Sequence, residues 1–293
     1  EDNNKDGLKD VLAINWISNQ VLLYTSYARL KYNLPSTMDF QDEPMRVLTT
    51  EINNDGITDI AVSFHNGRHI TTLLGDGLGN FNLYQDIKLS DEIDKMIIAD
   101  VEYGGTDEIL TFHKSKKYLS LWIKDNKGYF TETAQYSLGK NPGDVDLLLH
   151  SNTNYYDLLF TDLIEKKLNF VNNSKIALPV KNEFKYITGL KPTSIKALDI
   201  LQTGSVDLVI ANEGSKSISL FKNNGYGYFE GQVSIQTPIE YPKSVNAEVK
   251  KPGLFFALTT HNESSQLSVT EVTLADYSHS SFNITMPSRP EIL

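Results

Sequence analysis

Oxygen-bearing residues alternate with other residues in two short segments, a spacing suited to binding a hard divalent cation. The candidate ligands are Asp2, Asn4, Asp6, the Leu8 carbonyl and Asp10 in the first segment, and Glu51, Asn53, Asp55, the Ile57 carbonyl and Asp59 in the second. Both segments have a glycine at the sixth position, Gly7 or Gly56, where the chain must turn sharply. Calcium takes about six to eight oxygen ligands in flexible arrangements of this kind. The two segments therefore predict two calcium loops, with Ca2+ as the cofactor.

The loops differ from the helix-flanked calcium loop of EF-hand proteins. Position twelve, where an EF-hand has a bidentate glutamate, is Ala13 in the first segment and Val62 in the second. Each segment also continues into a short apolar run typical of a buried strand. We therefore expect both calcium loops to be hairpin loops between strands.

Three later copies of the segment lose candidate ligands. The copy at Asp100 has Gly104 at the fifth position and counts as one residue short when aligned on Asp107. The copy at His150 is also shortened, and the copy at Asp199 has Leu201 at its third position. We expect no tight metal binding in these copies. An alternative interpretation of all five copies is a hairpin turn in which Asp and Asn side chains bond to their own backbone.

The loops belong to an internal repeat that extends along the chain. Repeats begin at Asp2, Glu51, Asp100, His150, Asp199 and Glu248, at spacings of 49, 49, 50, 49 and 49 residues. A second landmark keeps the same register, because Tyr32, Phe81, Phe130 and Phe229 each lie thirty residues after a repeat begins. Two landmarks in one register indicate a repeat architecture rather than coincidence.

The second repeat predicts four strands, over 45–52, 58–64, 69–74 and 81–89, joined by hairpin turns. Four-stranded antiparallel units of this kind are the blades of a β-propeller. A proline marks the start of the first strand in most repeats, at Pro44, Pro142, Pro192, Pro242 and Pro287. The fold class predicted for residues 1–293 is thus all-β: a single β-propeller domain with six visible blades, or seven as an alternative. We expect the strand near Glu291 to close the propeller by completing the blade that begins at Val11.

The loop pattern, followed by an apolar strand and then a Gly-rich turn with phenylalanine, resembles the FG-GAP or VCBS repeat of integrin-alpha-type β-propellers. This resemblance covers nearly the whole chain and is strongest in the first two repeats. It implies calcium at the ten ligand positions named above, and a role in adhesion or extracellular recognition. Glu51 departs from the usual aspartate, and six repeats depart from the commoner seven.

The composition excludes several other classes of protein. The net charge of −10, the pI near 5.1 and only four arginines argue against nucleic-acid binding, which needs clustered cations. The absence of cysteine excludes disulfides and thiolate metal sites. No apolar run reaches the roughly 18 residues of a membrane-spanning helix, so we expect no direct membrane insertion.

No catalytic motif stands out from the sequence. The Gly75–Asn80 segment resembles a phosphate-binding loop, but no helix follows it, and a hairpin turn is the better interpretation. The six histidines form no metalloprotease or nucleophile motif. We therefore expect a non-catalytic, extracellular, cell-surface or periplasmic interaction or adhesion module. The alternative is a carbohydrate-binding lectin or a polysaccharide lyase.

Strand order predicts where a protein or glycan partner binds. In a four-stranded meander, the one-to-two and three-to-four turns share one face, called here the turn face. The two-to-three loops and the links between blades share the opposite face, the link face. Because loops on a rigid scaffold carry most binding residues, we expect the link face to bind the partner. The candidate contact residues are Trp16, His65, Asn66, Arg68, His113, Tyr186 and Tyr241.

Overall fold

A computed structural model describes residues 2–65, 67–102, 104–149, 156–171, 183–225, 228–262 and 264–286. In these ranges the chain is all-β, and its single short helical turn is η1 (Glu213–Ser215). The chain divides into two compact units, Glu1–Ser137 and Leu138–Leu293. Asn66, the predicted loop at His150 and the predicted closing segment 287–293 lie outside the described residues.

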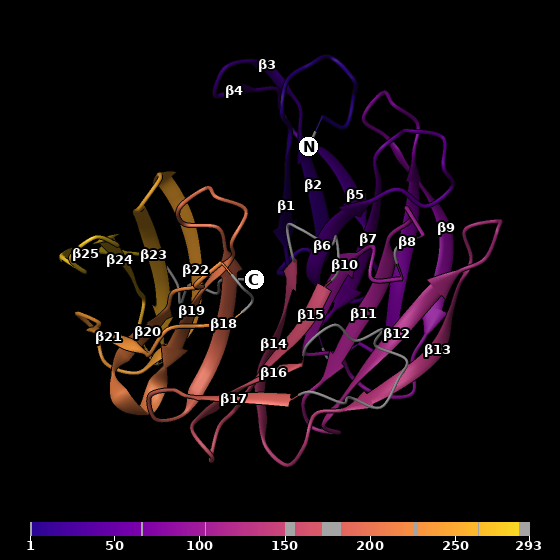
Figure 1. Ribbon diagram of the computed structural model, residues 1–293. Helices are drawn as coiled ribbons and strands as arrows, with labels where there is room; N and C mark the ends of the chain where they lie inside the picture. The colour runs from indigo at the N-terminus through magenta and orange to yellow at the C-terminus, as the bar shows by residue number, and fades with distance from the viewer. Residues whose placement is uncertain are drawn as a thin grey trace. The chain divides into compact units, whose positions relative to one another are not determined.

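The first unit contains three consecutive antiparallel sheets and one small ribbon (Figure 1). The sheets are β1-β2-β5, β6-β7-β8-β9 and β10-β11-β12-β13, and the ribbon is β3-β4. The strand bounds are β1 Val11–Asn15, β2 Gln20–Tyr24, β3 Ser26–Ala28, β4 Lys31–Tyr32, β5 Ser36–Asp39, β6 Pro44–Thr50, β7 Asp59–Phe64, β8 His69–Gly75, β9 Phe81–Lys88, β10 Lys95–Ala99, β11 Glu108–His113, β12 Tyr118–Lys124 and β13 Phe130–Ser137.

The second unit contains three four-stranded antiparallel sheets, each with its strands in chain order. The strand bounds are β14 Pro142–Leu149, β15 Tyr156–Asp162, β16 Lys167–Val171, β17 Glu183–Ile187, β18 Pro192–Leu198, β19 Asp207–Asn212, β20 Ser217–Phe221, β21 Val233–Gln236, β22 Pro242–Lys251, β23 Leu254–His261, β24 Gln266–Thr273 and β25 His279–Thr285. The four strands predicted for the second repeat match β6 to β9 to within two residues at each end.

The apolar runs form strands that are buried on both faces. Every residue of β7, β11 and β19 is buried. Alternate residues of β19 enter two separate cores, with Leu208 and Ile210 packing toward the preceding sheet and Val209 and Ala211 toward the following one. Each fully buried Val, Leu or Ile side chain contributes about 1.5–3 kcal/mol. Sheets that pack face to face through both sides of their strands are typical of propeller-like folds.

The recurring prolines lie at the starts of strands, as predicted. Pro44, Pro142, Pro192 and Pro242 are the first residues of β6, β14, β18 and β22. The pairing register shifts directly after each of these four prolines, which indicates a bulge. Proline has no N–H for the ladder, so a strand start followed by a bulge suits it. Pro287 lies outside the described residues.

Three sequence interpretations require correction. The loop at Asp100 has full length, because Glu108 and not Asp107 begins β11 at the position that Asp59 occupies in β7. No loop begins at Glu248, which lies within β22; the chain turns instead through Pro252 and Gly253. The landmark Tyr32 lies in the β3-β4 ribbon, whereas its counterparts Phe81 and Phe130 begin the fourth strands β9 and β13.

Candidate calcium loops and link face

The first candidate calcium loop is closed by its own side chains. The Asp2 carboxylate accepts hydrogen bonds from the backbone N–H groups of Asp6 at 3.1 Å and Gly7 at 2.9 Å. Asn4 Oδ1 accepts from the Asp6 N–H at 3.2 Å, and Asp6 Oδ1 accepts from the Leu8 N–H at 2.8 Å. Gly7 has φ of 86°, a conformation that glycine adopts without steric cost. The loop therefore gathers its oxygens on one tight turn.

The second candidate calcium loop repeats this geometry position by position. Glu51 accepts from the N–H groups of Asp55 at 3.3 Å and Gly56 at 2.8 Å, and Asp55 accepts from the Ile57 N–H at 2.7 Å. The Asn53 side-chain amide donates to Asp55 Oδ2 at 2.8 Å, as the Asn4 amide donates to Asp6 Oδ2 at 3.0 Å in the first loop. The longer Glu51 side chain thus replaces aspartate without changing the turn.

The position-one hydrogen bonds also occur where the other candidate ligands are missing. Asp100 accepts from the N–H groups of Gly104 and Gly105, both at 2.9 Å. Asp199 accepts from those of Thr203 at 3.1 Å and Gly204 at 2.6 Å. Hydrogen bonding between the position-one carboxylate and the loop N–H groups is therefore a property of the turn and does not depend on the other candidate ligands. What distinguishes the first two loops is the Asn and Asp pair at positions three and five.

The first two loops offer oxygen ligands of the type that calcium binds. Positions one, three and five offer carboxylate and amide oxygens that are half-buried or exposed, and the remaining backbone carbonyl at position seven is also a hard donor. Within the described ranges, no three His, Cys, Asp or Glu side chains come together as a metal-binding group. In these loops the carboxylates are turned toward backbone N–H groups.

The carboxylate at position nine is a buried clamp. Asp59 Oδ2 accepts from the Ile52 N–H at 2.7 Å, and Asp59 Oδ1 accepts from the Gly75 N–H at 2.8 Å. Asp10 makes the equivalent bonds, both of 2.8 Å, to the N–H groups of Asn3 and Ser26. Asp59 thereby ties its loop to the end of β8, and Asp10 ties its loop to Ser26, the first residue of β3. A carboxylate oxygen can accept more than one bond, so calcium ligation by Asp10 and Asp59 stays a prediction.

An acid at the same position also accepts backbone hydrogen bonds in repeats that lack the other ligands. Glu108 Oε2 accepts from the N–H groups of Val101 at 2.9 Å and Glu102 at 3.0 Å, and Asp207 Oδ1 accepts from the Asn223 N–H at 2.8 Å. Burial raises the pKa of Asp59 and of Glu108, and it raises the pKa of Asp207 to about 6. An acidic residue recurs at position nine even in repeats that lack the other ligands. This recurrence was the sequence signal that the position-nine carboxylate bonds to the backbone.

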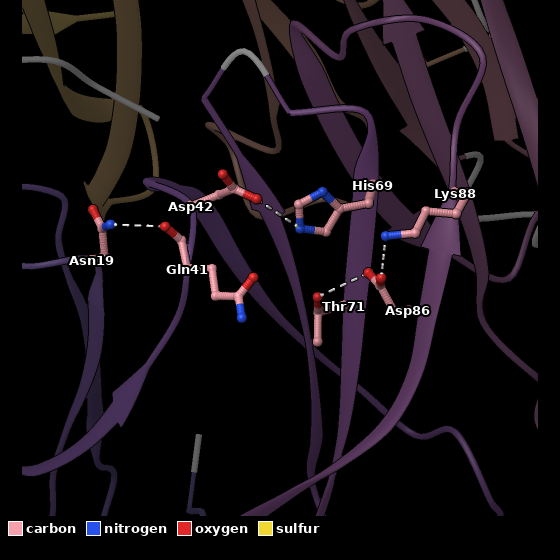
Figure 2. A network of polar contacts seen from close by, with 7 residues as sticks. All are labelled: Asn19, Gln41, Asp42, His69, Thr71, Asp86 and Lys88. Atoms are coloured by element: carbon pink, nitrogen blue, oxygen red, sulfur yellow. Dashed lines mark hydrogen bonds and ion pairs between the residues drawn. The ribbon is translucent and has the colours of Figure 1, made fainter.

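The link face of the first unit is tied together by hydrogen bonds between its loops. The Asn19 side chain donates to the Gln41 carbonyl at 3.1 Å, and the Phe40 N–H donates to the Asn19 carbonyl at 2.9 Å. Figure 2 shows Asn19 and Gln41 beside Asp42, whose carboxylate lies 3.7 Å from His69 Nε2. The His69 ring stacks on Phe64 at 4.3 Å between ring centroids. This network holds the turn that carries Trp16 close to the link between β5 and β6.

The predicted contact residues divide into exposed and buried ones. Trp16 is 61% exposed and Tyr241 is 47% exposed, and both lie in connections between strands. His65 and Arg68 are also exposed, with Arg68 3.9 Å from the Glu92 carboxylate. These four residues have the accessibility that a contact residue needs.

His113 does not belong to the exposed set, because it is only 1% exposed. Its Nε2 bonds to the Thr111 hydroxyl and its Nδ1 to the Glu92 carbonyl, both at 2.8 Å. Its ring stacks on Tyr118, and burial lowers its pKa. His113 is therefore a structural residue that fixes the preceding link, and its prediction as a partner contact was wrong.

Tyr186 also differs from its prediction, because it lies in β17 and not in a link. Its ring packs against Phe221 and Phe229, and its hydroxyl accepts from the Phe229 N–H at 3.3 Å. A half-buried tyrosine bound in this way serves the core between two sheets.

The first unit has an exposed apolar ribbon on its turn face that the sequence pattern did not predict. The ribbon and the residues that follow it expose Tyr27, Leu30 and Leu34, the last of them 94% exposed. Figure 1 shows this ribbon projecting from the strands of its unit. The signal for it was the eleven-residue segment 25–35, which stands where the next repeat has the short turn Asp76–Asn80.

Comparison with known proteins finds solved structures with a similar fold but does not show a family. No family model matches the chain, and no curated protein matches it. A functionally unknown protein from Desulfotomaculum acetoxidans DSM 771 superposes with a TM-score of 0.68 at 9% identity, covering 96% of this chain and 82% of that one. A protein from Lactobacillus plantarum gives 0.65 at 10% identity, over 96% and 84% of the two chains. Dihydro-heme d1 dehydrogenase NirN, in complex with DHE, gives 0.61 at 10% identity, over 96% and 56%.

The sheets and these neighbours define the class: an all-β, β-propeller-like protein. At such low identity the likeness concerns the fold alone. In the described part of the chain, no helix is both long and apolar enough to cross a membrane.

Proposed function

We propose that this protein is a non-catalytic, calcium-binding interaction module of the FG-GAP or VCBS type, acting outside the cytoplasm in adhesion or recognition. The observation that carries the proposal is the matched geometry of the two loops. They share the same closing hydrogen bonds, the same positive φ at Gly7 and Gly56, and the same Asn and Asp pair. The two loops keep the side-chain oxygens at positions one, three and five, whereas other repeats lose some of them. This difference supports a metal site that is retained in the two loops.

In this proposal calcium supplies the positive charge that holds the loop carboxylates together. Asp2, Asn4 and Asp6 would hold one ion, and Glu51, Asn53 and Asp55 the other, with the carbonyls of Leu8 and Ile57. Asp10 and Asp59 would complete the sets while also bonding to the backbone of Ser26 and Gly75, respectively. The bound ions would stiffen the scaffold that presents the link face.

Calcium titration followed by thermal unfolding tests the metal sites. Calcium at about a hundred times its dissociation constant stabilises the folded state by roughly 2.7 kcal/mol per site, which is a rise of about 5 °C in Tm for a chain of this size. Asp55→Ala is expected to remove the contribution of the second site. Thr203→Ala is the matched control, because Thr203 occupies position five of a loop without the Asn and Asp pair.

Absence of a calcium-dependent Tm shift, together with no calcium by elemental analysis, would contradict the proposal. A shift that Asp55→Ala and Thr203→Ala reduce equally would show that the effect does not arise at the second loop.

The link face is the proposed partner-binding surface, and Trp16 is its strongest candidate. Tryptophan and arginine are enriched among residues that dominate binding energies, and Trp16 and Arg68 are exposed on loops of the first unit. The double variant Trp16→Ala and Arg68→Ala is expected to lose partner binding at unchanged Tm. Leu78→Ala, in a turn-face loop, should retain binding. A glycan array distinguishes a lectin from a protein receptor, and release of reducing ends from polysaccharides would identify a lyase instead.

A further inference from the structure

A cavity in the second unit lies where the sixth repeat has lost its loop. In the fifth repeat, eight residues connect β18 to β19, whereas only Pro252 and Gly253 connect β22 to β23. The shortened turn leaves a cavity of about 490 Å³ on the turn face, within the usual range of small-molecule sites. Leu201, Leu254 and Leu274 supply apolar wall, and Lys222, Lys251 and Glu271 supply charge.

The backbone around the cavity is fixed by hydrogen bonds between the two sheets. The Gly253 N–H donates to the Ile200 carbonyl at 2.9 Å, and the Gly253 carbonyl accepts from the Leu274 N–H at 2.8 Å. The shortened turn is therefore anchored both to the loop of the fifth repeat and to the end of β24. A cavity lined by such anchored backbone is largely formed before a ligand arrives.

The cavity holds one lysine without a described counterion. Lys222 lies 3.6 Å from the Glu230 carboxylate, and Glu271 lies 3.4 Å from the Lys250 ammonium. Among the described ion pairs none involves Lys251, which is exposed. The register of the β22-β23 pair shifts between Val249 and Lys251. Bulges of this kind redirect side chains, and this one places Lys251 at the cavity.

We propose that this cavity binds an apolar monocarboxylate, with the ligand carboxylate at Lys251 and its hydrocarbon part against Leu201, Leu254 and Leu274. One unpaired ammonium matches a single negative charge. The nearby Glu271 carboxylate repels a dianion such as a phosphate monoester. The same chemistry is offered by a free organic acid and by the C-terminal leucine of a peptide. The proposal requires neither calcium nor the link face.

Three small probes test the charge and the apolar part separately. Octanoate is expected to shift the backbone amide NMR signals of Gly253, Leu254 and Thr273 in a saturable manner. Octanamide, which lacks the charge, and acetate, which lacks the apolar chain, are each expected to bind at least about tenfold more weakly. An acetylated Gly-Gly-Leu peptide with a free carboxylate, compared with its amide, shows whether a peptide C-terminus is also accepted. Binding of octanoate without binding of the peptide would assign the site to free organic acids.

A lysine substitution tests the position of the carboxylate. Lys251→Gln is expected to weaken octanoate binding about tenfold and to reduce its salt dependence, because the charged partner is removed. Lys243→Gln is the matched control, since Lys243 is an exposed lysine at the other end of the same strand. No saturable shift with octanoate, equal binding of octanamide, or an unchanged affinity in Lys251→Gln would each overturn the proposal.

Discussion

At the scale of single residues, the carboxylate at position nine has a structural role that does not depend on a metal. Asp59 is completely buried and accepts two backbone hydrogen bonds from different parts of its sheet. Of its ligand-poor counterparts, Asp207 accepts from the Asn223 N–H beyond its loop, whereas Glu108 accepts from the Val101 and Glu102 N–H groups within its loop. A buried acceptor shared by two N–H groups is costly to remove, because both donors lose their partner.

Asp59→Ala is expected to lower the free energy of unfolding by about 2–4 kcal/mol, because it leaves two backbone N–H groups without partners. The loss should appear in urea denaturation both with calcium and with excess chelator. Asp55→Ala is the comparison, since Asp55 is exposed and its effect should require calcium. A loss in Asp59→Ala that vanishes in chelator would show that Asp59 acts only through the metal.

Asp207 provides a pH-dependent prediction. Burial raises its pKa from 3.8 to about 6 in the folded state, so its contribution to stability is fully present below about pH 4 and is lost as the pH rises through 6. The unfolding free energy of the wild type relative to Asp207→Asn should therefore fall between pH 4 and pH 7, by up to about 3 kcal/mol. Chemical denaturation at several pH values measures this difference. A difference that is constant over this range would contradict the raised pKa.

At the scale of elements, close approaches between neighbouring sheets fix the first strands. Gly143 in β14 lies against β18, and a Cβ atom at Gly143 would be 2.4 Å from the Pro192 carbonyl oxygen and 2.5 Å from the Thr161 hydroxyl. Thr161 donates to that same carbonyl at 2.9 Å. Glycine is thus required where two strands and a side-chain bridge meet.

Gly143→Ala is expected to destabilise the protein by about 1–3 kcal/mol, the usual range for overpacking. Gly231→Ala is the matched control, because no atom lies within 4 Å of its added Cβ and its backbone needs no positive φ. The control should change stability by less than about 0.5 kcal/mol. Thermal unfolding of both variants tests the contact, and equal Tm values for Gly143→Ala and the wild type would refute it.

At the scale of the whole molecule, the repeat predicts that the two ends of the chain share one blade. The first sheet has three strands, and β1 lies at its edge in the described ranges. Residues 287–293 have the sequence of a first strand, beginning with proline. Closing a sheet edge removes unpaired backbone groups that otherwise promote aggregation.

Deletion of residues 287–293 is therefore expected to lower the Tm and to increase aggregation. A chain with the same length, in which these residues are replaced by a Gly and Ser sequence, separates strand pairing from mere chain length. Scanning calorimetry and light scattering measure the two effects. An unchanged Tm in both altered chains would show that the segment does not complete a blade.

The sequence by itself determined the all-β class, the strand positions and the two oxygen-rich loops. These features depend on local sequence patterns, namely apolar runs and glycine and proline at turns. The same patterns recur in successive repeats, which makes them easier to recognise. The strands of the second repeat and the prolines at strand starts were correct for this reason.

Only the tertiary structure decided which polar residues are buried. Asp59 bonds to Gly75, sixteen residues away, and His113 to Glu92, twenty-one residues away, so sequence spacing could not separate clamps from exposed contacts. The correct equivalence of Glu108 with Asp59 likewise depends on strand pairing. The Lys251 cavity depends on a shortened turn packing against a loop about fifty residues earlier in the chain. Burial and close packing are properties of the assembled sheets, and no local pattern records them.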